Sequence, residues 1–394
     1  MFENLKKKYQ DIFGKEPEIL VRAPGRVNLI GEHTDYQGGY VFPIAVDRYI
    51  YCLGSRREDR KLEIYSFNYD QFVEADLKKI AYSHRFPWAN YVFGVVKSLG
   101  EKGVEISGAE MLVGGDVPIG GGLSSSAALE ISTATFLQKL SETTLTPLEV
   151  VKLAQKAENE FVGVSCGIMD QFSSYLCKKG YGLLLRCKDL EFQHVPLNLG
   201  KNIILLVDTK KERRLSASEY NERVKALKKV INTLKRKGME LEYLVDVRKE
   251  ELLNLRGELD KVAFQRALHV VEENERVLKA VDYLREGKID DFGNLLYQSH
   301  ESLATLYEVS CEELDFIVDF SKNFEGVKGA RLTGAGFGGC ALVLLEEEAI
   351  EDFEKALRVK YSYRFGKTPE FYRVFSVNGA YYEYLRNKSA FPLS

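Results

Sequence analysis

Short apolar runs alternate with polar, glycine-containing loops in the first third of the chain. Runs rich in β-branched and aromatic residues occupy positions 19–22, 41–46, 50–55, 62–67 and 109–113. This composition predicts β-strands, and the closely spaced early runs indicate a meander. After residue 120, apolar positions recur at helical spacing, which predicts one helix ending near residue 140 and a second ending near residue 161.

The later part of the chain is predicted to be mainly helical and then to alternate helices with strands. Helices are expected at residues 218–238, 247–255, 262–286, 289–306, 311–321 and 348–361, and strands at 182–186, 203–208, 341–345 and 371–375. Because 394 residues exceed the usual size of one hydrophobic core, two domains are expected. We place their boundary near residue 200, which gives the segments 1–200 and 201–394.

The composition argues against several classes of partner. A formal net charge of −3 at pH 7 provides no field that would gather nucleic acid or anionic lipid. No stretch approaches the roughly 20 apolar residues of a membrane span. The six cysteines and five histidines are dispersed, unlike a disulfide framework or a metal-ligand cluster. We therefore expect a cytoplasmic monomer with reduced thiols and no nucleic-acid or membrane partner.

A glycine-rich segment links a predicted strand to a predicted helix. Residues 118–128 read Pro-Ile-Gly-Gly-Gly-Leu-Ser-Ser-Ser-Ala-Ala. Consecutive glycines let backbone N–H groups turn toward an anion, and the serines open a helix whose positive end faces the same point. The segment predicts a phosphate-binding loop, with a plain turn and a serine cap as the alternative. It is not a Walker loop, because no lysine follows its last glycine.

Two other short motifs are rejected on their context. Residues 334–339 fit the Gly-x-Gly-x-x-Gly spacing of dinucleotide-binding proteins, but a strand-like run follows where a helix is required. Asp291-Phe292-Gly293 matches the metal-binding triplet of protein kinases, yet it lies in a predicted helix. Neither a Rossmann domain nor a protein kinase is expected.

Four separated segments share motifs with one known family. They are residues 24–36, which include Gly31-Glu32-His33-Thr34-Asp35-Tyr36, the glycine-rich loop 118–128, the segment Cys166-Gly167-Ile168-Met169-Asp170-Gln171, and residues 328–340. Together they resemble the galactokinase family of the GHMP small-molecule kinases. The resemblance implies an α+β GHMP kinase fold, with a ribosomal-protein-S5-like amino-terminal domain and a ferredoxin-like carboxyl-terminal domain. The active site would lie between these domains.

The resemblance also implies roles for individual residues. The matches to the catalytic carboxylate and to the cation beside it are Asp170 and Arg26. The matches to sugar contacts are Glu32, His33, Asp35, Gly167 and Tyr220. The matches to ATP contacts are Gly120, Gly121, Gly122, Leu123, Ser124, Ser125, Ser126, Ala127 and Trp88. Mg²⁺ bound with ATP is the implied cofactor, and the matches to its ligands are Ser126 and Glu158.

These side chains suit such roles on chemical grounds. A sugar hydroxyl is a poor nucleophile at neutral pH, so Asp170 can accept its proton while the guanidinium of Arg26 keeps Asp170 ionised. The plainer alternatives are a helix cap for Asp170 and a surface ion pair for Arg26. Glu158 shares a predicted helix face with the apolar Val151 and Ala154. It therefore needs a cation or hydrogen-bond partners, unless it reaches water.

The expected reaction is transfer of a phosphoryl group from ATP to the C1 hydroxyl of galactose. Two alternatives remain open: a kinase for another sugar, such as N-acetylgalactosamine or arabinose, and a sensor that binds sugar and ATP without catalysis. One segment departs from the family pattern, because residues 209–215 read Thr-Lys-Lys-Glu-Arg-Arg-Leu and are unusually charged. This departure bears on the surroundings of Tyr220.

Overall fold

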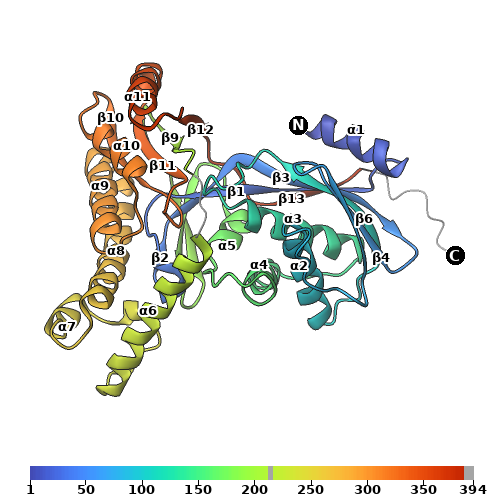
Figure 1. The fold of residues 1–394 in the computed structure, drawn as a ribbon, viewed down its shortest axis with the longest axis horizontal. Coiled ribbons are helices and arrows are strands. Elements are labelled where there is room, and N and C mark those ends of the chain that lie inside the picture. The colour runs from blue at the N-terminus through green and yellow to red at the C-terminus, as the bar shows by residue number, and fades with distance from the viewer. Residues whose placement is uncertain (212–215, 386–394) are drawn as a thin grey trace.

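A six-stranded sheet forms the centre of the first half of the chain (Figure 1). The computed structural model describes residues 1–211 and 216–385. The strand order is β13-β1-β3-β6-β4-β5, and all neighbours are antiparallel except the parallel pair β4 and β6. The bounds are β1 (Ile19–Asn28), β3 (Pro43–Arg57), β4 (Lys61–Ser66), β5 (Gln71–Asp76), β6 (Gly108–Gly115) and β13 (Tyr381–Tyr384).

Helices lie on both sides of this sheet. Residues of one face, such as Val21 and Cys52, belong to a large buried cluster that includes side chains of α2 to α5. The next residues along the strands, Leu20 and Leu53, pack on the opposite face with α1, because successive strand residues alternate between faces. The bounds are α1 (Phe2–Phe13), α2 (Ala89–Glu101), α3 (Ser125–Leu140), α4 (Pro147–Lys156) and α5 (Met169–Leu176).

The second half is built on a four-stranded antiparallel sheet with the order β10-β11-β9-β12. One face, which carries Leu206 and Leu344, joins the buried cluster of the first half. The other face, which carries Leu205 and Val343, packs against the helices of the second half. The two halves therefore share a continuous hydrophobic core. The bounds are β9 (Asn202–Asp208), β10 (Val327–Leu332), β11 (Cys340–Glu346) and β12 (Glu370–Val374).

A small third sheet and a group of helices complete the structure. The small sheet has the order β2-β7-β8, and α8 packs against two of its strands. Its bounds are β2 (Tyr40–Val41), β7 (Tyr181–Arg186) and β8 (Glu191–Pro196). The helices are α6 (Ser216–Arg236), α7 (Lys249–Asn254), α8 (Lys261–Arg285), α9 (Ile289–Thr305), α10 (Glu312–Lys322) and α11 (Ile350–Phe365). Every helix within the described ranges is too short or too polar to cross a membrane.

Most predicted elements are confirmed, and the differences are local. The runs 41–46 and 50–55 are not two strands, since residues 43–57 form the single strand β3. Three helices, α1, α2 and α5, and the strands β5, β8, β10 and β13 were not predicted from the pattern. Both rejected motifs are in the predicted context, because residues 334–339 lead into β11 and residues 291–293 lie in α9. Of the charged segment 209–215, residues 212–215 lie outside the described residues.

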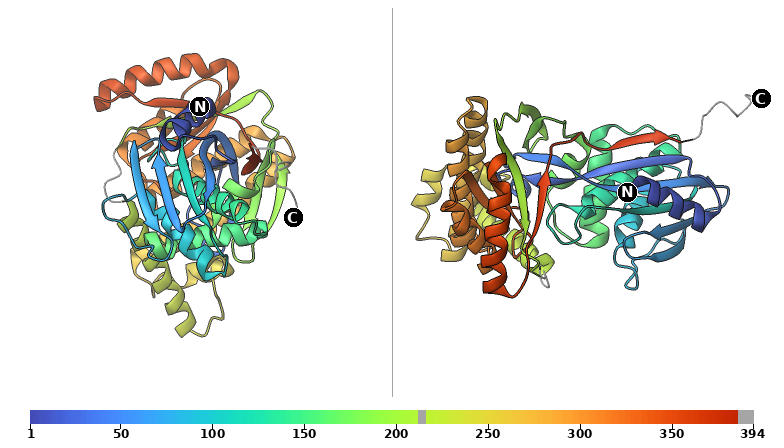
Figure 2. Two further views of the ribbon diagram at one scale, coloured as in Figure 1. Left: turned by 90° about the vertical axis from the view of Figure 1, so that its right-hand side faces the viewer. Right: turned by 90° about the horizontal axis from the view of Figure 1, so that it is seen from above.

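The last described strand returns to the first sheet (Figure 2). β13 pairs antiparallel with β1, with Tyr384 opposite Ile19 and Tyr381 opposite Arg22. The segment 201–394 therefore contributes one strand to the sheet of the first half. The division of the chain at residue 200 stays a prediction.

Candidate active site

A pocket with a volume of about 650 Å³ contains most of the predicted site residues. Its walls come from loops, strands and helices of the first half, from α6 and from the turn after β10 at Gly334 and Ala335. The predicted residues that line it are Arg26, Glu32, His33, Asp35, Trp88, Gly120, Gly122, Ser124, Ser125, Ser126, Glu158, Gly167, Asp170 and Tyr220. The predicted ATP contacts Gly121, Leu123 and Ala127 are buried beside the pocket and do not line it.

Arg26 and Asp170 form a bidentate ion pair inside this pocket. Arg26 Nε donates to Asp170 Oδ1 and Arg26 Nη2 donates to Asp170 Oδ2, each at 2.7 Å. The third nitrogen, Nη1, donates to the carbonyl oxygen of Gly122 at 2.5 Å, and the hydroxyl of Ser124 donates to Asp170 Oδ2. Burial alone would lower the pKa of Arg26, but the charge and hydrogen bonds of Asp170 raise it above its ordinary value. Asp170 is therefore held against a permanent positive charge.

The phosphate loop depends on backbone conformations that favour glycine. Gly120 and Gly122 have φ angles of 76° and 84°, a region that residues with a Cβ rarely adopt. Ser124 also has a positive φ, 57°, and its hydroxyl is the group that contacts Asp170. Helix α3 begins at the next residue, so the loop ends at a helix N-terminus that favours anions.

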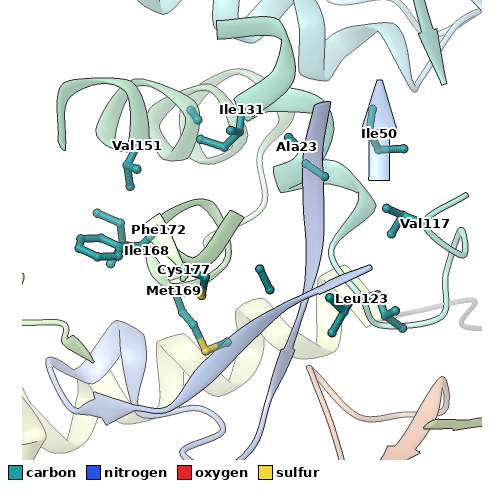
Figure 3. Close-up of a cluster of buried hydrophobic side chains, with 14 of the residues drawn as sticks. Ala23, Ile50, Val117, Leu123, Ile131, Val151, Ile168, Met169, Phe172 and Cys177 are labelled. Atoms are coloured by element: carbon teal, nitrogen blue, oxygen red, sulfur yellow. The ribbon is translucent and has the colours of Figure 1, made fainter. Parts of the chain in front are cut away.

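The same loop is anchored against β1 and the hydrophobic core. The backbone N–H of Arg26 donates to the carbonyl oxygen of Leu123 at 3.0 Å. A Cβ on Gly25 would approach that oxygen to 2.7 Å, so a side chain there would displace the loop. The side chains of Val117 and Leu123 belong to the buried cluster that also contains Ala23 (Figure 3). Core packing thus fixes the distance between Arg26 and the phosphate loop.

Glu158 lies in a single π-helical turn, η2 (Ala157–Val162), that follows α4. Such turns inside helices are frequent at functional sites. The Glu158 carboxylate accepts hydrogen bonds from Gln171 Nε2 at 2.7 Å and from Ser126, and among the described residues no Lys or Arg forms an ion pair with it. Burial, and then the negative charge of Asp170, raise the pKa of Glu158 to about 7.

A divalent cation fits the oxygens of Glu158 and Ser126. A buried carboxylate with a raised pKa is stabilised by a nearby positive charge. Mg²⁺ takes oxygen ligands, and it commonly uses one or two carboxylates together with substrate phosphates and water. Within the part of the chain that the structure describes, no group of three or more His, Cys, Asp or Glu side chains could hold a metal ion. The remaining ligands would therefore have to come from a nucleotide and from water.

Asp35 and Gly167 are in direct contact on another side of the pocket. A Cβ at position 167 would lie 1.9 Å from Asp35 Oδ2, so only glycine leaves room for this carboxylate. Burial, and then the charge of Asp170, raise the pKa of Asp35 to about 7. Two carboxylates, Asp35 and Asp170, thus line one pocket, and carboxylates accept hydrogen bonds from hydroxyl groups.

His33, two residues before Asp35, has a left-handed backbone conformation with a φ of 64°. Its Nε2 lies 3.3 Å from the carbonyl oxygen of Ala335, which can only accept, so Nε2 carries the proton. Nδ1 then accepts from the hydroxyl of Tyr36 at 2.8 Å, and that hydroxyl accepts from Tyr307 at 2.6 Å. Burial lowers the pKa of His33 to about 3, so the ring is neutral at pH 7. The ring of Tyr220 lies 5.7 Å from it.

Part of the pocket lining is aromatic. The rings of Trp88 and Tyr69 lie 6.3 Å apart and nearly parallel, at 9°, and the indole N–H of Trp88 donates to Gln71 at 2.7 Å. Tyr82 and Tyr91 line the pocket as well. Flat aromatic side chains of this kind offer an apolar surface for a planar ring.

Several of these residues were missed in the sequence. Tyr69, Tyr82 and Tyr307 lie outside any recognisable motif, so no signal was available for them. Glu130 of α3 is 0% exposed and accepts a hydrogen bond at 2.9 Å from Gln171, the same amide group that donates to Glu158. The argument applied to Glu158, a carboxylate among apolar helix positions, would have found Glu130 too.

Comparisons with known proteins agree with this geometry. Three family models match the chain. The galactokinase galactose-binding signature matches residues 7–56, the GHMP kinases N terminal domain matches residues 90–178, and the GHMP kinases C terminal domain matches residues 280–362. The chain is 43% identical to the galactokinase of Thermosipho africanus and 44% identical to that of Thermotoga maritima. Each alignment covers 92% of this chain and 99% of the relative.

Solved structures give the same result. The structure of Lactococcus lactis galactokinase complexed with galactose matches with a TM-score of 0.93 and 36% identity, over 96% of this chain and 99% of that chain. A mevalonate kinase structure, at a TM-score of 0.64 and 22% identity over 91% of this chain and 99% of that chain, shares the fold alone. The GHMP kinase fold predicted from the sequence is confirmed, and the protein is a sugar kinase. The chain belongs to the galactokinase family.

Proposed function

We propose that this protein transfers the γ-phosphoryl group of ATP to the C1 hydroxyl of galactose, giving galactose 1-phosphate and ADP. The observation that carries the proposal is the Arg26–Asp170 pair, which lies between the phosphate loop and the loop that holds His33 and Asp35. A hydroxyl that reaches Asp170 from the side of Asp35 is directed toward a phosphate on the glycine-rich loop. Kinases obtain most of their rate from such alignment and from charge stabilisation.

In the proposed mechanism Asp170 accepts the proton of the C1 hydroxyl. Arg26 holds the carboxylate of Asp170 through two charge-assisted hydrogen bonds and stabilises the negative charge that develops between the substrates. Ser124 and the two guanidinium hydrogen bonds hold the carboxylate in one orientation. Magnesium bound with ATP would be held by Glu158 and Ser126 and would neutralise phosphate charge.

The other predicted residues supply binding. Asp35 would accept hydrogen bonds from ring hydroxyls, and the neutral His33, Glu32 and Tyr220 would complete the sugar contacts together with the backbone at Gly167. The phosphate loop, residues 120–127, would bind ATP through backbone N–H groups. Trp88 would lie against the adenine.

A coupled assay of ADP release with a panel of sugars tests this proposal. Galactose should be turned over more efficiently than N-acetylgalactosamine or arabinose, as judged by kcat/KM. Faster turnover of one of the other sugars would change the assigned substrate, and binding of galactose and ATP without any ADP release would indicate a sensor. The expected monomeric state, the cytoplasmic location and the lack of nucleic-acid or membrane partners stay predictions.

A further inference from the structure

Arg331 is the largest fully buried side chain in the described part of the protein. It lies on β10 in the second half of the chain, but its hydrogen-bond partners belong to the first half. Nη1 donates to the carbonyl oxygens of Asn28 and Leu29 at 3.3 and 2.9 Å, and Nη2 forms an ion pair with Glu32 Oε2 at 2.5 Å. Arg331 therefore binds the chain just where β1 ends and the sugar-binding loop, residues 28–41, begins.

Glu32 is enclosed by donors from both halves. Its Oε2 accepts from Asn28 Nδ2 at 2.6 Å in addition to the ion pair with Arg331. Its Oε1 accepts from the backbone N–H of Gly334 at 2.8 Å and lies 3.3 Å from the hydroxyl of Thr333. Two carboxylate oxygens offer about four lone-pair sites, so these partners use most of the hydrogen bonds that Glu32 can accept. The side chain is 2% exposed.

The contacts of Glu32 also constrain the backbone of the next residue, His33. A non-glycine residue with a left-handed φ costs roughly 1–3 kcal/mol and persists only where its surroundings fix it. His33 has a φ of 64°, and its ring is held by Ala335 on one side and by Tyr36 on the other. The backbone before it is fixed by Arg331 and Gly334 through Glu32. Other contacts, such as those of Thr34 and His269, also hold this segment, but Arg331 supplies the only ion pair to Glu32 among the described residues, and its loss would weaken the anchor nearest Asp35.

We propose that Arg331 is a positioning residue for sugar recognition, which holds the sugar-binding loop in its binding conformation from the opposite half of the protein. The inference rests on the proposed function, because it assigns the loop to galactose. In the described residues, the hydrogen-bond and ion-pair partners of the Arg331 side chain lie at positions 28–32, while its backbone pairs with Leu342 of β11. The groups assigned to ATP and magnesium are therefore not held by Arg331, and the two ligands should respond differently to its loss.

The test compares Arg331→Met, Arg331→Lys and a control, Arg57→Met. Arg331→Met replaces the aliphatic stem of arginine with a similar unbranched chain but removes the guanidinium and all its contacts. Arg331→Lys keeps the positive charge but loses the planar guanidinium group. Arg57 lies on β3, pairs with Asp59 and Glu63, and does not line the pocket, so its substitution controls for the loss of an ion-paired arginine. Calorimetry measures Kd for galactose and for ADP, thermal melting followed by circular dichroism verifies the fold, and steady-state kinetics gives KM for each substrate and kcat.

The expected result is selective for the sugar. In Arg331→Met, Kd and KM for galactose should rise by roughly 10- to 100-fold, the range for loss of a charged hydrogen bond, while Kd for ADP changes less than about threefold. Arg331→Lys should fall between this variant and the wild type, and Arg57→Met should bind both ligands as the wild type does. An unchanged Kd for galactose in a folded Arg331→Met protein overturns the inference. An equal loss of both ligands also overturns it, since that is the result of a general structural role.

A second variant covers the case in which Arg331→Met does not fold. Thr333→Val keeps the shape of the side chain but removes the hydroxyl that lies 3.1 Å from the carbonyl oxygen of Asn28 and 3.3 Å from Glu32. It should weaken galactose binding by roughly 3- to 10-fold, again without an effect on ADP, and equal binding of galactose would reject the inference. The wild type is measured first: a wild type that does not bind galactose rejects the proposed function itself, whereas the variants test only the role of Arg331.

Discussion

Replacement of Asp170 by Asn tests the mechanism most directly. The substitution keeps the volume of the side chain but removes its basic oxygen and its charge. Arg26 presents N–H groups to both oxygens of Asp170, at 2.7 Å each. Whichever way the new amide is oriented, its NH₂ group therefore faces an N–H of Arg26. One of the two charge-assisted hydrogen bonds must be lost, and the donor–donor contact will push Arg26 away from its present position.

The magnitude follows from these contacts. Loss of a general base costs roughly 10²- to 10⁴-fold in turnover, and loss of one hydrogen bond to a charged group costs about 1.5–3 kcal/mol. We expect kcat to fall by at least about 10²-fold, because both effects act on the step in which Asp170 accepts a proton. Galactose affinity should stay within about tenfold of the wild type, because Asp35 and His33 retain their contacts. The assays are coupled ADP release for kcat and calorimetry for galactose.

Arg26 provides the matched control for this prediction. Arg26→Lys keeps a positive charge beside Asp170, so it should reduce kcat less than Arg26→Ala does. Circular dichroism must verify that each variant is folded. The reasoning is refuted by an Asp170→Asn protein that retains most of its turnover, because the proton would then leave by another route and Asp170 would serve only to bind the sugar.

Three further predictions follow from the pocket. Asp35→Ala should weaken galactose binding by about 1–3 kcal/mol with little effect on ADP, and calorimetry that finds both ligands equally weakened would remove Asp35 from the sugar site. Gly167→Ala should also weaken galactose, because its Cβ would meet the Asp35 carboxylate, and this loss should shrink in the double variant with Asp35→Ala; full additivity contradicts the contact. Glu158→Gln should raise the magnesium concentration needed for half-maximal rate. In the wild type the magnesium concentration for half-maximal rate should rise as the pH falls through about 7, because protonation removes the charge of Glu158. The same pH dependence in Glu158→Gln would show that another group is responsible.

The local parts of the site could be predicted from the sequence because short-range chemistry determines them. The glycines and serines of residues 118–128 specify a turn and a helix start, and they form both in the structure. Thr146 and Glu149 likewise make reciprocal capping contacts at the start of α4, three residues apart in the sequence. Helix α2 was missed because it contains Gly94 and Gly100, which lower helix propensity. Tertiary packing explains Gly94, since a Cβ there would touch Ala157 at 3.0 Å.

The long-range parts could not be predicted in this way. Nothing in the pattern around Arg331 indicates its burial, and the contacts of its side chain with residues 28–32 depend on how the two halves of the chain meet. The π-helical turn at Glu158 has no local pattern that distinguishes it from a continuous helix. The return of β13 to β1 joins positions more than 350 residues apart, and periodicity carries no information about such pairing.

The pairing of β13 with β1 also has a consequence for synthesis on the ribosome. The neighbour that completes the edge of residues 19–28 is residues 381–384, which are translated more than 350 residues later. Until those residues emerge, one edge of β1 has unpaired N–H and C=O groups, which can pair with other chains. The nascent protein therefore carries an open sheet edge while more than 350 residues are synthesised, and truncation before residue 381 would make that edge permanent.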